Sequence, residues 1–460
     1  MSEKENPGSG LWLGLAACAM IAGIAVAILA AAPILLPAAT PPAAPQDTGR
    51  GTAVALDGGW LALGARFEPS TGSVGVGVVP AAPAPRVGAV LLFQRSGNQW
   101  LEHSQLFAAA PRPEDQFGSA VALRDGVLAV GAPGRNRGNP RRGTGAVYLY
   151  HLVAGEWSSP SIVTGCTGSP SIDHFGRSLA LDGGWLAVGG LGAVCILSAG
   201  DPGSATRLLP AISGQPGSRF GESVALSGPL LAVGAPGRDL SSCRGCGAVD
   251  LFSRSGNRWG RTGTLRAPDG RSFDQFGTAV AVSGTRIAVG APGAVVPLPP
   301  AVGRRSGAVY VFFPGLPGAS PWVPAPRITT PPPFAKKGDR FGAALAMEGG
   351  LLAVGAPPLP LPAAEGKLAP FRPGAAYVFN VLSSLVTFRV SLGSSASQLD
   401  LFGAAVAVRG QEVIVGAPLA NGLGTNAGAA RAYVCSTGCA ALGEELPPVK
   451  RPPQGTGAPP

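Results

Sequence analysis

The sequence predicts an all-β fold: a seven-bladed β-propeller of four-stranded blades, preceded by one N-terminal hydrophobic helix. Two observations carry this prediction. A Phe-Gly element, a Val-Gly-Ala-Pro element and a Gly-Ala-Val element return in the same order along the chain, and such self-similarity indicates a repeat architecture. Short apolar runs lie between glycine-containing turns in every repeat, which is the pattern of β-strands.

The residues before the repeats have a different composition. After a short flank at 1–10, the segment 11–36 begins with an apolar run from Leu11 to Ala32 that contains no charged residue. This run is long enough to cross a bilayer and longer than the core of an ordinary signal peptide. We expect a transmembrane anchor or a cleaved signal sequence there, followed by a Pro/Ala-rich linker at 37–49. The remaining chain is then membrane-anchored and extracytoplasmic, or secreted if the segment is cleaved.

The repeats span residues 50–446, in units that start near residues 50, 117, 175, 220, 276, 341 and 402. The Phe-Gly element opens six of them, at Phe117, Phe175, Phe220, Phe276, Phe341 and Phe402, whereas the first unit has Arg50 at this place. A unit of about 60 residues cannot bury both faces of one sheet, so neighbouring units must pack on one another. The Pro-rich tail at 447–460 is expected to be disordered.

Each unit contains four candidate strands. In the second unit, SAVALRDGVLAVGA consists of two strands around Asp125-Gly126, a dipeptide typical of a tight hairpin turn. GAVYLY at Gly145 and its counterparts are a third strand, rich in β-branched and aromatic residues. A fourth, weaker strand carries a tryptophan in four units, namely Trp100, Trp157, Trp259 and Trp322. Four antiparallel strands per repeat make one propeller blade.

The alternation of Phe-Gly with Gly-Ala-Pro resembles the FG-GAP repeat of integrin α-subunit propellers and their bacterial relatives. The resemblance covers nearly all of residues 50–446. It is strongest to the subgroup with an aspartate two residues before Phe-Gly, as at Asp115, Asp173, Asp274, Asp339 and Asp400, although Ser218 departs from it. This resemblance implies a seven-bladed ring that acts in extracellular recognition, adhesion or scaffolding and not in catalysis. It also implies that the loops after the Gly-Ala-Pro elements form the ligand face.

Many relatives bind calcium in an acidic loop between the first and second strands. In this sequence a two-residue turn with at most one carboxylate, such as Asp125 or Asp182, holds that place. Calcium needs about six to eight oxygen ligands, so we expect neither calcium nor any other cofactor. The aspartates before Phe-Gly are expected to cap turns. The six phenylalanines are expected to act as wedges between blades, next to glycines that let backbones approach closely.

The loops after the Gly-Ala-Pro elements differ in length and composition while the strands around them stay alike. Variable loops on a rigid scaffold are a common place for recognition. These loops and one blade connection contain the candidate ligand-face residues Arg135, Arg137, Arg141, Arg142, Arg304, Arg305, Lys336 and Lys337. Such side chains suit carboxylates, sulfates and phosphates, so the expected partner is a protein or an anionic glycan at the cell surface. The alternative is a solvated basic rim without a specific partner.

Six of the seven cysteines follow the apolar segment. Cys243 and Cys246 belong to the fourth unit and Cys435 and Cys439 to the seventh. These units lie nearly opposite each other in a ring of seven, which argues against one shared zinc site. In an oxidising compartment we expect the disulfides Cys243–Cys246 and Cys435–Cys439. Cys166 and Cys195 are a third candidate pair, and the alternative for Cys195 is a buried free thiol.

Composition and motifs bound the function. The net charge of +10 favours anionic partners only weakly. Nucleic acid is not expected, because no aromatic residues alternate with the basic ones. The chain has three histidines and no P-loop, Rossmann, zincin or nucleophile-elbow motif, so we predict that it is not an enzyme. Two alternatives stay open. One is a hydrolase or lyase of an anionic surface polymer that uses carboxylates in the central channel. The other is a structural envelope protein without a discrete ligand.

Overall fold

The computed structural model divides the chain into two compact units, Met1–Ala44 and Pro45–Pro460. The residues that it describes all belong to the second unit: 48–69, 86–135, 143–166, 172–208, 215, 217–298, 301–315, 321–331, 338–358, 373–382, 385–393, 400–419, 428–436 and 439–441. The expected segments at 1–10, 11–36 and 447–460, and nearly all of the 37–49 linker, lie outside the described residues. Within these residues no helix is long and apolar enough to span a bilayer.

Seven antiparallel sheets form the blades, each from one contiguous stretch of chain. Blade 1 consists of β1 (Arg50–Asp57), β2 (Trp60–Ala65), β3 (Ala89–Ser96) and β4 (Gln99–Leu106). Blade 2 consists of β5 (Ala120–Arg124), β6 (Val127–Ala132), β7 (Ala146–Val153), β8 (Glu156–Trp157) and β9 (Ser161–Val163). Blade 3 consists of β10 (Asp173–Asp182), β11 (Trp185–Leu191), β12 (Val194–Ser198) and β13 (Asp201–Leu208). In blade 2 both β8 and β9 pair with β7, so the outermost strand is split in two.

Blades 4 to 7 repeat the same order of strands. Blade 4 consists of β14 (Ser223–Ser227), β15 (Leu230–Ala235), β16 (Ala248–Ser255) and β17 (Arg258–Leu265), and blade 5 of β18 (Ala279–Ser283), β19 (Arg286–Ala291), β22 (Ala308–Pro314) and β23 (Trp322–Pro324). Blade 6 consists of β24 (Ala344–Glu348), β25 (Leu351–Ala356), β26 (Ala375–Val381) and β27 (Val386–Gly393). Blade 7 consists of β28 (Ala405–Arg409), β29 (Glu412–Ala417), β30 (Ala429–Cys435) and β31 (Cys439–Ala441).

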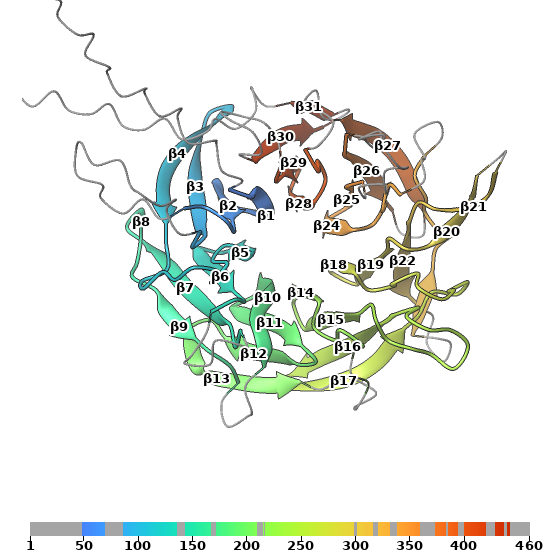
Figure 1. Cartoon of the computed structure of the whole chain (residues 1–460), viewed down its shortest axis with the longest axis horizontal. Coiled ribbons are helices and arrows are strands. Elements are labelled where there is room, and N and C mark those ends of the chain that lie inside the picture. The colour runs from blue at the N-terminus through green and yellow to red at the C-terminus, as the bar shows by residue number, and fades with distance from the viewer. Residues whose placement is uncertain are drawn as a thin grey trace, which may run out of the picture. The chain divides into compact units, whose positions relative to one another are not determined.

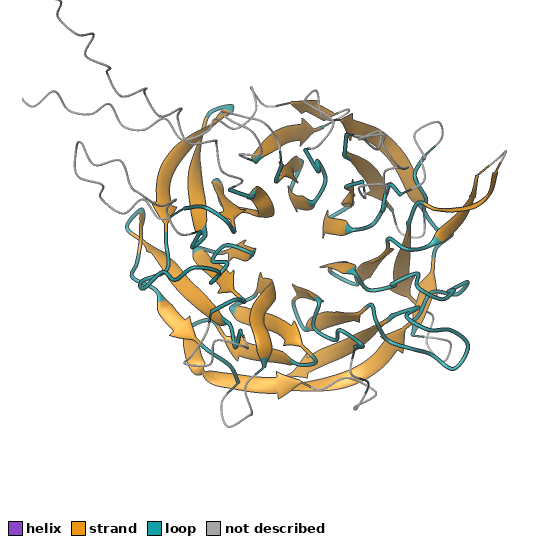
Figure 2. Cartoon of the chain, viewed as in Figure 1, coloured by secondary structure: helices purple, strands orange, loops and turns teal. Residues whose placement is uncertain are grey.

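The blades stand around one centre in the order of the sequence (Figure 1). The first strand of each blade lies innermost, and the last strands lie at the rim of the ring. The described part of the chain contains strands and loops and no helix (Figure 2). The predicted fold, a seven-bladed propeller of four-stranded blades, is confirmed for this unit. The N-terminal helix of the same prediction lies outside the described residues.

Tight turns join the first and second strands as the sequence indicates. In blade 2, Asp125 and Gly126 have φ angles of 50° and 73°, and Arg124 pairs with Val127 across them. Positive φ at both central residues is the geometry of the turn that matches the twist of a hairpin. The predicted tryptophans lie in the outermost strands β4, β8, β17 and β23. Each is the second residue of its strand except Trp322, which is the first.

The core of the ring lies between the blades. Seven clusters of buried apolar side chains each join residues of two neighbouring blades. In the first cluster, Val121 and Leu123 of β5 lie with Ala53 and Ala55 of β1. Burial of apolar surface on both faces of every sheet stabilises the ring, so a single blade could not keep this core.

The Phe-Gly elements lie at the contacts between blades, here called seams. Phe117 is fully buried and forms a parallel bridge with Gly88 of blade 1. The same bridge recurs at Gly145–Phe175, Gly247–Phe276 and Gly307–Phe341. At the seam of blades 7 and 1 the bridge joins Arg50 to Gly428, and Arg50 Nε donates to Glu68 Oε2 at 3.0 Å. A half-buried ion pair thus takes the place of the phenylalanine where the ring closes.

One element departs from the sequence expectation. The loop after Gly-Ala-Pro in blade 5 is not irregular: it contains the hairpin β20 (Val295–Leu298) and β21 (Ala301–Arg305). Figure 1 shows this hairpin projecting from the outer edge of the ring. The prolines in this loop argue against a strand within a sheet, and this hairpin forms a separate two-stranded sheet.

Candidate functional site

The antiparallel blades give the ring two different faces. The loops between second and third strands and the connections between blades emerge on one face, which we call the loop face. The turns between first and second strands and between third and fourth strands lie on the other, the turn face. The sequence places its candidate ligand residues on the loop face.

Only part of the predicted basic set can be located. Arg137, Arg141, Arg142, Lys336 and Lys337 lie outside the described residues, and the side chain of Arg304 is not described either. Arg135 and Arg305 are described, and both are engaged by the protein itself.

Arg135 turns inward. It is half-buried, donates a hydrogen bond to the Tyr148 hydroxyl, and its guanidinium carbon lies 5.2 Å from the centre of the Tyr148 ring. Burial raises the pKa of Asp115, and the backbone N–H of Arg112 and the charge of Arg135 oppose this rise. Arg135 thus offsets the cost of burying the Tyr148 hydroxyl and the Asp115 carboxylate beneath the loop, which is a structural role.

Arg305 is exposed but holds a blade connection in place. Its Nη1 donates to the carbonyls of Phe273 at 3.1 Å and Gly293 at 2.9 Å, and its Nη2 donates to the carbonyl of Ser272 at 3.4 Å. These three bonds tie the connection between blades 4 and 5 to the loop that carries Arg305. Arg305 therefore fixes the conformation of the surface between blades 4 and 5. Its positive charge stays exposed at this surface.

A buried ion pair in blade 4 was not predicted. Arg238, which follows Gly-Ala-Pro-Gly as Arg135 does, is 1% exposed, and Asp250 is fully buried. Arg238 Nη1 and Nη2 donate to the two Asp250 carboxylate oxygens at 3.0 and 2.6 Å, and the Thr264 hydroxyl donates to Asp250 Oδ1 at 2.6 Å. The signal in the sequence was an aspartate in the apolar third strand, GAVDLF at Gly247.

Three disulfides close loops in the ring. They join Cys243 to Cys246, Cys435 to Cys439, and Cys166 to Cys195. The first lies in the loop-face loop of blade 4, the second at the turn between β30 and β31, and the third links the end of blade 2 to β12. Cys195 is fully buried, so this link fixes the blade connection to the core of blade 3.

Three of the aspartates before Phe-Gly accept backbone hydrogen bonds. Asp115 Oδ2 accepts from the Arg112 N–H at 3.2 Å, Asp274 Oδ2 from the Arg271 N–H at 2.8 Å, and Asp400 Oδ1 from the Phe402 N–H at 3.1 Å. These bonds order the turn that leads into the inner strand. Among the described residues no group of three or more His, Cys, Asp or Glu side chains is placed to hold a metal ion.

The centre of the turn face carries a polar ring that sequence reasoning missed. The last residue of every inner strand lies at an equivalent position: Asp57, Arg124, Asp182, Ser227, Ser283, Glu348 and Arg409. Five of them accept a hydrogen bond from an amide in the turn of the next blade: Asp57 from Asp125, Asp182 from Gly228, Ser227 from Gly284, Ser283 from Gly349 and Glu348 from Gly410, at 2.7 to 3.1 Å. These hydrogen bonds link neighbouring blades around the centre of the ring.

Two arginines complete this polar ring. Arg409 Nε lies 2.9 Å from Asp57 Oδ1 and so joins blade 7 to blade 1. Arg124 Nε lies 3.1 Å from Asp182 Oδ1, and its Nη1 lies 3.4 Å from Glu348 Oε1. Blades 2 and 6 are not neighbours, so Arg124 reaches across the centre of the ring. The three carboxylates of the polar ring therefore all carry arginine partners.

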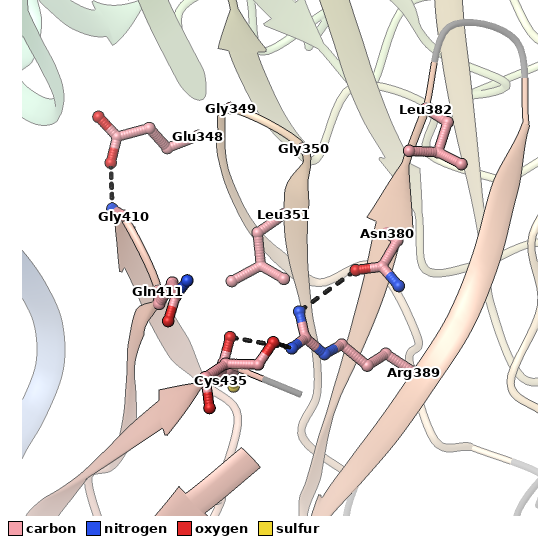
Figure 3. Close-up of a pocket in the computed structure, with 11 residues that line it drawn as sticks. Glu348, Gly349, Gly350, Leu351, Asn380, Leu382, Arg389, Gly410, Gln411 and Cys435 are labelled. Atoms are coloured by element: carbon pink, nitrogen blue, oxygen red, sulfur yellow. Dashed lines mark hydrogen bonds between the residues drawn. The ribbon is translucent and has the colours of Figure 1, made fainter. Parts of the chain in front are cut away.

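A pocket of about 380 Å³ opens on the turn face between blades 6 and 7 (Figure 3). Arg389 lies in it, with Nη1 donating to Asn380 Oδ1 at 3.3 Å and Nη2 donating to the Cys435 carbonyl at 3.0 Å. Leu382 and Leu351 supply apolar walls. Because protein acceptors occupy this guanidinium, the pocket presents glycine backbone and apolar surface more than free donors.

A comparison with protein families finds the repeat that the sequence motifs indicate. The family model of the FG-GAP repeat matches residues 100–150 and 259–312, which run from an outermost strand into the next blade's third strand and from β17 to β22. The chain carries FG-GAP repeats and folds as a β-propeller. A search of curated proteins gave no significant match.

Among solved structures, this FG-GAP propeller is similar to "KlHsv2 with loop 6CD replaced by a Gly-Ser linker". The identity is 10%, the alignment covers 84% of this chain and 92% of that chain, and the TM-score is 0.44. In the FG-GAP propeller the residues that name the repeat occupy the seams: the phenylalanine is buried between blades and the following glycine contacts the neighbouring backbone.

Proposed function

We propose that this FG-GAP propeller is a recognition or scaffolding module that acts outside the cytoplasm, with the loop face as its ligand face. One observation carries the proposal. The inner strands keep the same pairing from blade to blade, whereas the loops between second and third strands range from two residues at 192–193 to twenty-three at 66–88. A constant scaffold with variable loops is suited to binding.

The disulfides support the extracytoplasmic part of the proposal. Three disulfides in one ring are typical of proteins from an oxidising compartment. The segment 11–36 would deliver the ring there as a membrane anchor or as a signal sequence. The net charge of +10 would then attract an anionic glycan or an acidic protein at the cell surface.

The polar ring of the channel favours binding over catalysis. A hydrolase or lyase that works in the channel would need a carboxylate within reach of substrate and able to exchange protons. Asp57, Asp182 and Glu348 each contact an arginine and accept a backbone hydrogen bond. This arrangement suits blade-to-blade linkage.

A binding experiment with the full chain tests the proposal. The probes are heparin, alginate and poly-glutamate, each immobilised and compared at low and physiological salt. We expect retention of at least one probe, several-fold weaker retention of Arg142→Glu, a substitution between β6 and β7 in the sequence, and unchanged retention of Arg258→Glu, an exposed residue that begins β17 beside the turn face.

Two results would contradict the proposal. One is the absence of retention on every probe. The other is an equal loss for both charge reversals, because non-specific attraction by net charge would not distinguish the faces. Degradation of a probe would instead favour the enzyme alternative.

A further inference from the structure

A large apolar side chain stands out on the loop face at the seam of blades 4 and 5. Phe273 precedes the aspartate of Asp274-Gln275-Phe276-Gly277, is 54% exposed and has a φ angle of 66°. The left-handed region is unfavourable for a bulky residue. A strained backbone conformation at an aromatic residue that is exposed to water points toward a function.

The equivalent positions of other blades make Phe273 unusual. The carbonyl of Phe273 lies against Gly293 just as the carbonyl of Glu114 lies against Gly134 and that of Gly217 against Gly237. Glu114 also has a positive φ angle, 65°. In blade 4 this place is held by Gly217, which adopts the conformation without steric cost. The backbone therefore does not require an aromatic side chain there.

The backbone of Phe273 is held in place on both sides. Its N–H donates to the Arg244 carbonyl at 2.8 Å, and its own carbonyl accepts from Arg305 at 3.1 Å. Gly245 lies so close that a Cβ there would be 3.2 Å from Phe273 Cδ1. The Cys243–Cys246 disulfide closes the loop that contains Gly245. The aromatic ring of Phe273 therefore lies next to a cross-linked loop.

Positive charge surrounds the ring. Arg244, Arg271 and Arg305 are all exposed, and among the described residues the side chains of Arg244 and Arg271 have no hydrogen bond or ion pair. The exposed Asp269 of the same connection is already paired with Arg327 and accepts from the Tyr310 hydroxyl at 2.6 Å. The Asp239 carboxylate accepts from the Gly245 N–H at 2.6 Å. The excess charge of this surface is therefore positive.

We propose that Phe273, Arg244, Arg271 and Arg305, here called the Phe273 platform, bind an acidic polypeptide segment in which an apolar side chain lies among carboxylates. Aromatic residues and arginine are enriched at binding hot spots. Guanidinium groups pair with carboxylates in a two-pronged geometry, and the exposed ring is dehydrated best by an apolar side chain. The proposal rests on the recognition function above and names the partner class of its ligand face.

The test uses the full chain and three probes. These are an acidic peptide with a central leucine-rich stretch, a peptide of the same charge in which serine replaces the leucines, and alginate. We expect the leucine-containing peptide to bind at least ten-fold more tightly than the serine peptide, and alginate not to compete. Higher salt should weaken binding, because arginine–carboxylate pairs at a surface are screened.

Phe273→Gly separates binding from folding. Glycine suits the left-handed backbone, so we expect an unchanged or higher melting temperature together with at least ten-fold weaker binding of the leucine peptide. The matched control is Glu114→Gly at the equivalent position of blade 2, which should affect the melting temperature in the same direction and leave binding unchanged. Arg244→Gln should weaken binding and reduce its salt dependence.

Several outcomes would overturn the proposal. A lower melting temperature for Phe273→Gly with unchanged binding would make the ring a structural residue. Competition by alginate that depends on Phe273 would assign the platform to an anionic polysaccharide. Failure of both peptides, with retention of heparin or alginate through Arg142, would remove this partner class and leave the recognition function standing. Failure of every probe would contradict both.

Discussion

One buried position in the third strand determines which hydrogen bonds form beneath the loop face. In blade 2 it holds Tyr148, which binds Arg135. In blade 4 it holds Asp250, which binds Arg238 through two hydrogen bonds. In blade 5 it holds Tyr310, whose hydroxyl donates to Asp269 at 2.6 Å. Each of these three side chains has a polar partner, and a buried polar group without one would lose its hydration without compensation.

Removal of one partner from the blade 4 pair should be strongly destabilising. Asp250→Ala leaves the buried Arg238 charge uncompensated, and we expect the free energy of unfolding to fall by about 3–5 kcal/mol. The double variant Arg238→Met/Asp250→Leu should recover most of this loss, because apolar residues of similar volume replace both charges. Urea denaturation measures both, and a loss below about 1 kcal/mol for Asp250→Ala would contradict this account.

A surface ion triad at the seam of blades 3 and 4 should make stability depend on pH. Burial alone would raise the pKa of Glu222, but hydrogen bonds from Arg177 and Arg219 outweigh it and lower that pKa. A lowered pKa in the folded state means that the carboxylate stabilises the fold above its ordinary pKa of 4.5, and this contribution is lost as the pH falls below that value. Both arginines are well exposed, so Glu222→Gln should cost only about 1 kcal/mol at pH 7.

The measurement is the difference in unfolding free energy between wild type and Glu222→Gln across pH 3 to 7. This difference should shrink in acid. Asp274 provides a control of opposite sign, because burial raises its pKa despite the hydrogen bond from the Arg271 N–H. Its ionised form opposes folding near neutral pH, so Asp274→Asn should be tolerated best above the raised pKa and lose that advantage in acid. A difference for Glu222→Gln that does not vary with pH would refute the role of the triad.

At the scale of elements, loops are closed covalently as well as by hydrogen bonds. The residues of the Cys166–Cys195 pair are 29 apart in sequence, whereas those of the other two pairs are 3 and 4 apart. A cross-link restricts the unfolded chain more when it closes a longer loop. The disulfides should therefore differ in their contribution although all three belong to one ring.

Serine substitutions should reveal this order. We expect Cys166→Ser/Cys195→Ser to lower the free energy of unfolding by about 3.5 kcal/mol, and Cys243→Ser/Cys246→Ser or Cys435→Ser/Cys439→Ser to lower it by about 2 kcal/mol. Guanidinium denaturation of the oxidised proteins measures the differences. Reduced wild type should resemble the sum of the three, and an inverted order would contradict the loop-closure explanation.

At the scale of the whole molecule, the ring closes without exchanging a strand between its ends. Blade 7 meets blade 1 through the Arg409–Asp57 pair, the Arg95–Glu412 pair and the Arg50–Gly428 bridge. Close backbone contact completes the seam: a Cβ on Gly51 would lie 2.3 Å from the Ala429 carbonyl oxygen. Side chains and glycine contacts therefore replace the covalent continuity that the other seams have.

Gly51→Ala should open this seam. Gly58→Ala is the matched control, because both residues have positive φ angles but a Cβ on Gly58 would meet nothing within 4 Å. The control should lose only about 1 kcal/mol, the cost of the left-handed backbone. Gly51→Ala should lose at least about 2 kcal/mol more, since the added methyl group must displace backbone of blade 7. Equal melting temperatures for the two variants would contradict the close-contact explanation.

The sequence could predict the repeats but not the contacts that depend on ring closure. The Phe-Gly elements and the turn at Asp125-Gly126 have local signals, so the blades follow from the sequence. Arg124 and Glu348 meet only because the inner strands of blades 2 and 6 face the same centre of the ring, and no local pattern in the sequence indicates that proximity. Arg135 was expected at a ligand surface, but its partner Tyr148 lies on the next strand, inside the blade. The exposure of Phe273 likewise depends on how a connection folds over a neighbouring loop.

Each blade is one uninterrupted stretch of chain. The same ring should therefore form when the chain begins at a different blade. The first and last strands meet at the same seam, so a flexible linker between residues 441 and 50 should allow new termini at any other blade connection. A circular permutant that starts at β14 should fold to the same ring, which far-ultraviolet circular dichroism and its melting temperature can check. The same modularity allows such a ring to grow or diverge by duplication of single blades, each free to acquire its own loop.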